Sequence, residues 1–113
     1  DMHSFIAAMA KQFPIDLAII VGHPAMIGQG PIGGHAFETG LTIASTDALA
    51  ADVVGARLLG FDPEGVGQLK EAAELGVGDA DLEKYEFPGL TLNEAIKIFT
   101  QRAYGKEISL EHA

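Results

Sequence analysis

The chain lacks cysteine and tryptophan, and it has only 7 basic residues against 16 acidic ones. Without cysteine it forms no disulfide, no thiolate zinc site, no cysteine-ligated iron–sulfur cluster and no cysteine nucleophile of its own. The net charge of −9 opposes nonspecific binding to nucleic acid and to anionic lipid, because both require clustered basic side chains. We therefore expect neither nucleic acid nor a membrane as a partner.

Long hydrophobic runs are also missing. The longest nearly apolar stretch, residues 17–26, is interrupted by glycine, histidine and proline, and it is about half as long as a membrane span. A chain of 113 residues with 48% hydrophobic content still suffices for one core. We expect a soluble, cytoplasmic domain. Because Asp1 is not an initiator methionine, we also expect this domain to be a fragment of a longer protein.

Hydrophobic periodicity and capping signals predict a small α/β fold. Apolar residues at helical spacing predict a helix over residues 2–13, and β-branched residues with little alternation predict a strand at 16–21 that is covered on both faces. Further strands are expected at residues 41–44 and 85–87. Three more helices are expected: from a cap at 45–47 to 59, over 62–75, and from a Thr91–Glu94 capping box to 104. We predict a single domain over residues 1–113, with about three strands and four helices in two or three layers.

Residues 22–36 contain five glycines, two prolines and two histidines, which predicts a long loop. Such loops are more often functional than idle, and glycine lets the backbone approach a ligand closely. We therefore predict a ligand-binding loop, with a tight structural crossover as the alternative. Its residues are Gly28, Gly30, Pro31, Gly33 and Gly34, together with Ser45 on the following strand.

A nucleotide site and a hydrolase are both disfavoured. Gly28, Gly30 and Gly33 match the spacing of a dinucleotide-binding fingerprint. That fingerprint opens a helix, whereas a strand is expected here, and residues 12–56 contain no lysine or arginine. The sequence also shows no nucleophile elbow and no diagnostic His–Asp spacing.

Four residues are candidate ligands for a divalent metal ion, since imidazole and carboxylate together suit Zn, Ni, Mn or Fe. Each has a plain structural alternative: His23 and His35 as exposed loop residues, Asp47 as a helix cap, and Asp52 as a paired carboxylate. Asp52 is expected on a largely buried helix, where an unpaired carboxylate costs several kcal/mol. Arg57 is placed awkwardly for pairing with it, so Asp52 needs a more distant partner.

Three segments together resemble domain-of-unknown-function family 362. They are Gln-Gly-Pro-Ile-Gly-Gly at 29–34, Ala-Ser-Thr-Asp-Ala-Leu-Ala-Ala-Asp at 44–52 and Arg-Leu-Leu-Gly-Phe-Asp-Pro at 57–63. The resemblance covers residues 16–95, including the turn at 88–89, and looks like the family's C-terminal half. The family's pattern carries acids where Val21 and Ile27 stand here, which implies an altered site.

The resemblance implies a redox-associated parent protein, because relatives often carry a ferredoxin-like segment with iron–sulfur clusters. It supplies no reaction. Two hypotheses follow. In one, the domain binds a ligand or metal through the glycine-rich loop, Ser45 and the histidines and aspartates. In the other, it is an assembly module that packs on a missing N-terminal or ferredoxin-like portion of the parent protein, or on a second copy.

Overall fold

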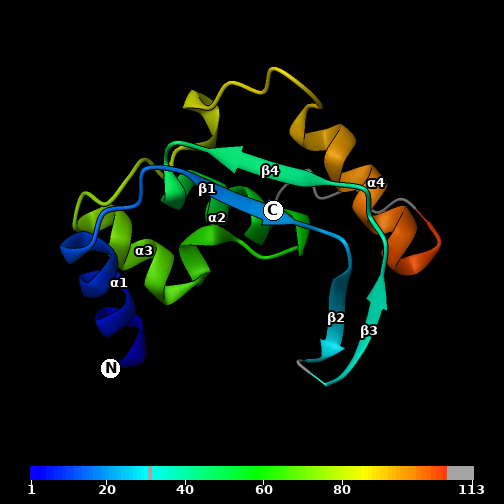
Figure 1. Cartoon of the computed structure of the whole chain (residues 1–113), viewed down its shortest axis with the longest axis horizontal. Helices are drawn as coiled ribbons and strands as arrows, with labels where there is room; N and C mark the ends of the chain where they lie inside the picture. The colour runs from blue at the N-terminus through cyan, green and yellow to red at the C-terminus, as the bar shows by residue number, and fades with distance from the viewer. Residues whose placement is uncertain (31, 107–113) are drawn as a thin grey trace.

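The computed structural model describes residues 1–30 and 32–106 of the chain (Figure 1). It confirms the mixed α/β class, with four strands in place of three. The elements in chain order are α1 (Met2–Gln12), β1 (Ala18–Val21), β2 (Ala25–Gln29), β3 (Gly33–Phe37), β4 (Thr42–Ser45), α2 (Ala48–Leu58), the 3-10 turn η1 (Pro63–Gly65), α3 (Gly67–Glu74), the 3-10 turn η2 (Leu82–Lys84) and α4 (Leu92–Tyr104).

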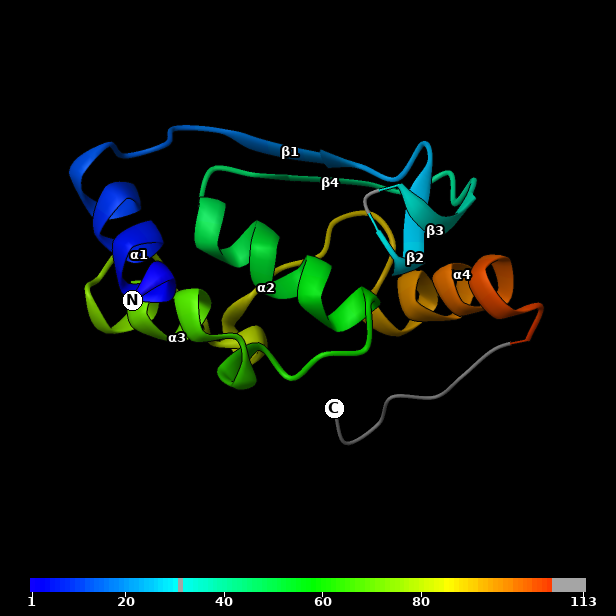
Figure 2. The ribbon, with the colours of Figure 1, turned by 90° about the horizontal axis from the view of Figure 1, so that it is seen from below.

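The strands form one long antiparallel ribbon that bends in its middle. β1 pairs with β4, and β2 pairs with β3. Figures 1 and 2 show the first pair running above α2 and the second turning down beside α4. The prediction of a long loop over residues 22–36 was therefore wrong: cross-strand pairing turns most of this segment into a hairpin, despite its glycines and prolines.

Glycine permits the hairpin because its two strands approach closely at Gly34. A Cβ atom on this residue would lie 2.6 Å from Met26 Cγ and 2.7 Å from the Ile27 carbonyl oxygen, distances that real Cβ atoms do not reach. Ala25, Ile27 and Phe37 pack from the hairpin against a core cluster formed by Leu41, Leu58, Ile96 and Phe99. Burial of these side chains favours strand pairing over an open loop.

The β1–β4 sheet is covered on one face only. Ile20 pairs with Ile43 on the face toward α2, whereas Ile19 and Val21 point away and remain 59% and 55% exposed. The expectation that β1 is covered on both faces was thus wrong. Antiparallel pairing allows this arrangement, since such sheets commonly leave one face open.

The helix caps predicted at Asp47 and at Thr91–Glu94 are present in the structure. Asp47 caps α2, and Thr91 and Glu94 form the reciprocal capping box of α4. The helix expected over 62–75 is split into η1 and α3. The strand expected at 85–87 is absent from the described residues: this segment follows η2 without pairing, and the Tyr85 hydroxyl donates to the Asp79 carbonyl.

Helix α2 joins the two halves of the core. Leu49, Val53 and Ala56 pack with α1 and α3, while Leu58 belongs to the cluster with α4. Among the helices formed by residues 1–30 and 32–106, none is long and apolar enough to span a membrane.

Candidate functional site

The glycines singled out in the sequence lie along the hairpin. Gly28 pairs with Gly34 and Gln29 with Gly33, while Gly30 follows at the turn. Pro31 lies outside the described residues. The close contacts at Gly34 give it a structural role in strand approach. A ligand-binding role for this segment stays a prediction.

The two candidate histidines lie in different surroundings. His23 sits at the bend of the ribbon, where its Nδ1 is 2.6 Å from Glu38 Oε2. His35 lies on β3, with its ring stacked on Phe37 at a centroid distance of 5.8 Å. Each histidine therefore has a local neighbour on the hairpin, and neither contact involves the helix aspartates.

Asp47 uses both of its carboxylate oxygens to hold the backbone. Oδ1 accepts a hydrogen bond from the Ala50 amide (3.0 Å), as an N-cap does, and Oδ2 accepts one from the Asp79 amide (2.8 Å). The Ser45 hydroxyl oxygen accepts from the Asp47 amide at 2.9 Å. These bonds tie the start of α2 to the segment before η2, which favours the capping interpretation of Asp47.

The acidic side chains near Asp47 influence the pKa of Tyr85. Burial, together with the carboxylates of Asp47, Asp79 and Asp81, raises the pKa of Tyr85 to about 12. The phenol therefore stays protonated over the physiological range and keeps its hydrogen bond to the Asp79 carbonyl.

Asp52 departs from the sequence-based expectation. Helix α2 is largely buried, as expected, but Asp52 itself is exposed and needs no distant partner to be tolerated. Partial desolvation against its apolar neighbours raises the pKa of the carboxyl above 3.8. No hydrogen bond or ion pair from the described residues reaches this carboxylate.

The four metal candidates do not converge. Across residues 1–30 and 32–106, no group of three or more histidine, aspartate or glutamate side chains is placed to hold a metal ion. Asp47 and Asp52 also lie beside different cavities. The structure thus separates the hairpin histidines from the helix aspartates, which the sequence pattern alone could not establish.

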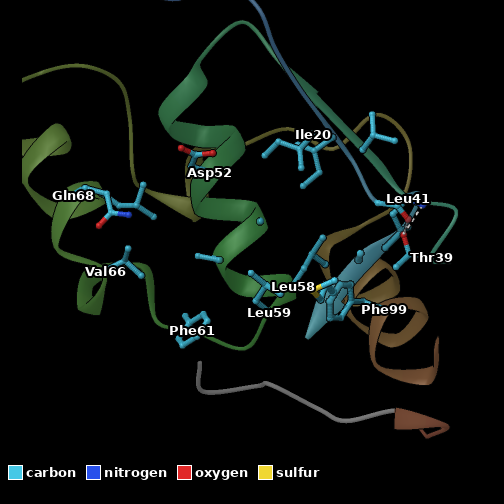
Figure 3. Close-up of a pocket in the computed structure, with 18 of the residues that line it drawn as sticks. Ile20, Thr39, Leu41, Asp52, Leu58, Leu59, Phe61, Val66, Gln68 and Phe99 are labelled. Atoms are coloured by element: carbon cyan, nitrogen blue, oxygen red, sulfur yellow. Dashed lines mark hydrogen bonds between the residues drawn. The ribbon is translucent and has the colours of Figure 1, made fainter. Parts of the chain in front are cut away.

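Asp52 instead borders an open groove of about 830 Å³ between β1, the bend of the ribbon, α2 and the segment leading into α3 (Figure 3). In that view Asp52 lies on α2, with Gln68 and Val66 toward one end of the groove and Thr39 and Phe99 toward the other. The walls are mainly apolar, with large side chains from Ile20, Leu41, Leu58, Phe61 and Phe99.

The polar groups of the groove are mostly paired with one another. The Thr39 hydroxyl donates to the Gly22 carbonyl (2.8 Å) and accepts from the Leu41 amide (3.0 Å). His3 Nδ1 lies 2.6 Å from Gln68 Oε1. Asp52 contributes the only carboxylate among the described residues that line the groove, and no lysine or arginine is among them.

One comparison with known proteins gives a match. A family model described as a domain of unknown function, DUF362, matches residues 1–57, just over half of the chain. The chain belongs to the DUF362 family. No curated protein and no solved structure matches it.

The DUF362 match ends in the last turn of α2. It includes the hairpin, Ser45, Asp47 and Asp52, and with them the groove walls contributed by β1 and most of α2. The groove walls contributed by Phe61, Gln68 and Phe99 lie beyond the match. Sequence reasoning missed this groove because its apolar residues come from segments far apart in the chain and carry no motif.

Proposed function

We propose that this DUF362 domain binds a small organic cation, an ammonium or amidinium group on an apolar body, in the groove beside Asp52. The observation that carries this proposal is a single carboxylate without a protein partner among the described residues, on a mainly apolar lining. A ligand of this class matches both the apolar walls of the groove and the carboxylate of Asp52. Its apolar body displaces water from the walls, and its charge meets Asp52.

The size of the groove supports a small-molecule ligand. Its volume of about 830 Å³ lies within the roughly 300–1,000 Å³ typical of such sites, which combine apolar walls with few polar anchors. The lining also discriminates by charge. With no lysine or arginine among the described lining residues and a chain charge of −9, a carboxylate or phosphate ligand meets repulsion and finds no partner.

A metal ion is supported less well at this position. Within the described ranges Asp52 belongs to no group of three or more histidine, aspartate or glutamate side chains that could hold a metal ion, whereas a tight site requires several donors. The iron–sulfur segment that the family resemblance implies for the parent protein is a separate proposal, and the organic-cation site does not depend on it.

Binding of tryptamine tests the proposal. The chain contains no tryptophan, so the indole fluorescence of the probe reports binding without protein background. We expect tryptamine to bind at least ten-fold more tightly than indole-3-propionate, which has a similar body and the opposite charge. Asp52→Asn should weaken tryptamine binding by about ten-fold, or ~1.4 kcal/mol, and should remove most of the preference for the cation.

Asp16→Asn is the matched control, because this exposed aspartate lies outside the groove and the substitution changes the net charge equally. It should leave both dissociation constants within two-fold of wild type. Equal affinity for the two probes would overturn the proposal. An equal loss in the two variants would do the same, since it would assign the preference to overall charge.

A further inference from the structure

The outer edge of β1 carries unpaired backbone groups. β1 pairs only with β4 in the described part of the chain. The Gly22 amide donates to the Leu41 carbonyl at 2.9 Å, and in an antiparallel ladder hydrogen-bonded and non-hydrogen-bonded pairs alternate. Ile20 is therefore bonded to Ile43, while Ile19 and Val21 direct their N–H and C=O groups to the free edge.

This edge is short, but no lysine, proline or bulge within it blocks strand addition. Proteins protect exposed edges with lysine, proline, bulges or a covering element. Residues 18–21 read Ala-Ile-Ile-Val, and they pair with β4 in regular register. Ile19 and Val21 also present exposed apolar side chains on the open face of the sheet. The edge is thus suited to a further strand.

Helix α1 adds a second apolar surface beside this edge, on the opposite face from Ile19 and Val21. In Figure 1 it lies on the side of β1 that faces away from β4, and Figure 2 places it in the layer of α2, below the sheet. Only Ala7 of α1 is buried, where the helix packs on α3. The apolar arc expected from the sequence is exposed instead; its members are Met2, Phe5, Ile6, Met9 and Phe13.

The extent of this surface indicates a macromolecular partner. Nine large apolar side chains are exposed on or beside this edge: the five of the arc, together with Ile15, Leu17, Ile19 and Val21. A strand presents side chains on both of its faces, so one added at the edge can contact the arc with one face and adjoin Ile19 and Val21 with the other. Residues 1–21 contain two acidic residues and one basic residue. The surface is therefore nearly uncharged within a chain of charge −9, which suits a neutral apolar segment.

We propose that an extended, neutral segment of a partner polypeptide, with alternating apolar side chains, adds to the free edge of β1 as a third strand. Its backbone pairs with Ile19 and Val21, and the apolar arc of α1 packs against its inner face. This mode of recognition draws affinity from main-chain hydrogen bonds and specificity from alternate side chains. It does not depend on the ligand of the groove.

The test uses acetyl-Thr-Val-Thr-Val-Thr-Val-amide as a neutral strand probe. Amide chemical shifts and hydrogen exchange of the ¹⁵N-labelled chain report where it binds. We expect the hydrogen-exchange rates of the Ile19 and Val21 amides to fall by at least ten-fold at saturating peptide. A control peptide with an N-methyl group on every residue, which removes the backbone donors of both edges, should give no protection.

Ile19→Pro removes one edge donor while sparing the bonds to β4, since proline is tolerated where the N–H faces solvent. It should weaken peptide binding at least ten-fold, whereas Ile19→Thr, which keeps the N–H, should weaken it less than three-fold. If Ile19→Pro does not fold, the N-methylated peptide decides alone. Equal losses in the two variants, protection elsewhere, or protection of Ile19 and Val21 by dimerisation of the chain without peptide would overturn the proposal.

Discussion

His23 Nδ1 and Glu38 Oε2 lie 2.6 Å apart across the bend of the ribbon, where the β1–β4 and β2–β3 pairs meet. Both side chains are largely exposed, at 50% and 65%. Beside them the Thr39 hydroxyl donates to the Gly22 carbonyl, and the Gly22 amide donates to Leu41. The bend is therefore held mainly by the bonds that Gly22 makes with Thr39 and Leu41, and the contact between His23 and Glu38 lies on its surface.

Glu38→Gln should consequently change stability little. An exposed pair of this kind contributes about 0–1 kcal/mol, and the amide oxygen of glutamine still accepts a hydrogen bond. Urea unfolding at pH 7 measures the effect, with His23→Ala and the double variant completing a cycle. Thr39→Val serves as the contrasting change: it removes two bonds of a buried hydroxyl and should cost about 1–3 kcal/mol. A larger loss for Glu38→Gln than for Thr39→Val would contradict this view of the bend.

Local signals in the sequence predicted the helices well. The cap at Asp47 and the Thr91–Glu94 capping box are short-range patterns, and both are present. The hairpin was missed because its pairing joins residues up to 12 positions apart, such as Ala25 opposite Phe37, and because a count of glycines does not reveal the close approach at Gly34. The exposure of Asp52 depends on which turn of α2 borders the groove, and no local pattern encodes that.

Two substitutions should separate the structural role of Asp47 from its electrostatic role. Asp47→Ala removes the two hydrogen bonds that the side chain accepts from backbone amides, so we expect a loss of about 1–3 kcal/mol in unfolding free energy. Asp47→Asn keeps one oxygen acceptor and should lose less. Because the Asp47 carboxylate helps to raise the pKa of Tyr85 to about 12, Asp47→Asn should also lower that pKa.

Ultraviolet absorbance near 295 nm follows the tyrosine titration, in a Tyr104→Phe background that leaves Tyr85 as the sole tyrosine. Asp62→Asn is the control, since it removes a cap carboxylate at η1 that is not among the groups acting on Tyr85. An unchanged Tyr85 pKa in Asp47→Asn would refute the electrostatic role.

Asp52 should give a distinct pH dependence of stability. Burial raises its pKa above 3.8 in the folded chain, so the folded state binds this proton more tightly than the unfolded state does. Stability contributed by this group therefore increases as pH falls through the folded pKa toward 3.8. At pH 7 we expect Asp52→Asn to match or slightly exceed wild type, within ~0.5 kcal/mol because the side chain is exposed.

Urea unfolding at pH 7 and pH 4 tests this sign, with Asp16→Asn as the matched variant. The difference between Asp52→Asn and wild type should shift in favour of wild type at pH 4, by more than the difference between Asp16→Asn and wild type does. A shift of the opposite sign would mean that a cation stabilises the Asp52 carboxylate in the folded chain.

Divalent metal ions should leave the stability of the chain nearly unchanged, because the described residues hold no group of three or more suitable ligands. A metal at 100 times its dissociation constant adds about 2.7 kcal/mol, which at this chain length raises Tm on the order of 10 °C. For the chelator-treated chain with Zn²⁺, Ni²⁺, Mn²⁺ or Fe²⁺ we expect less than about 2 °C on that scale. A rise near 10 °C with one metal, lost in both Asp52→Asn and His23→Ala, would restore the metal hypothesis, since it would require the hairpin and α2 to close on a common ion.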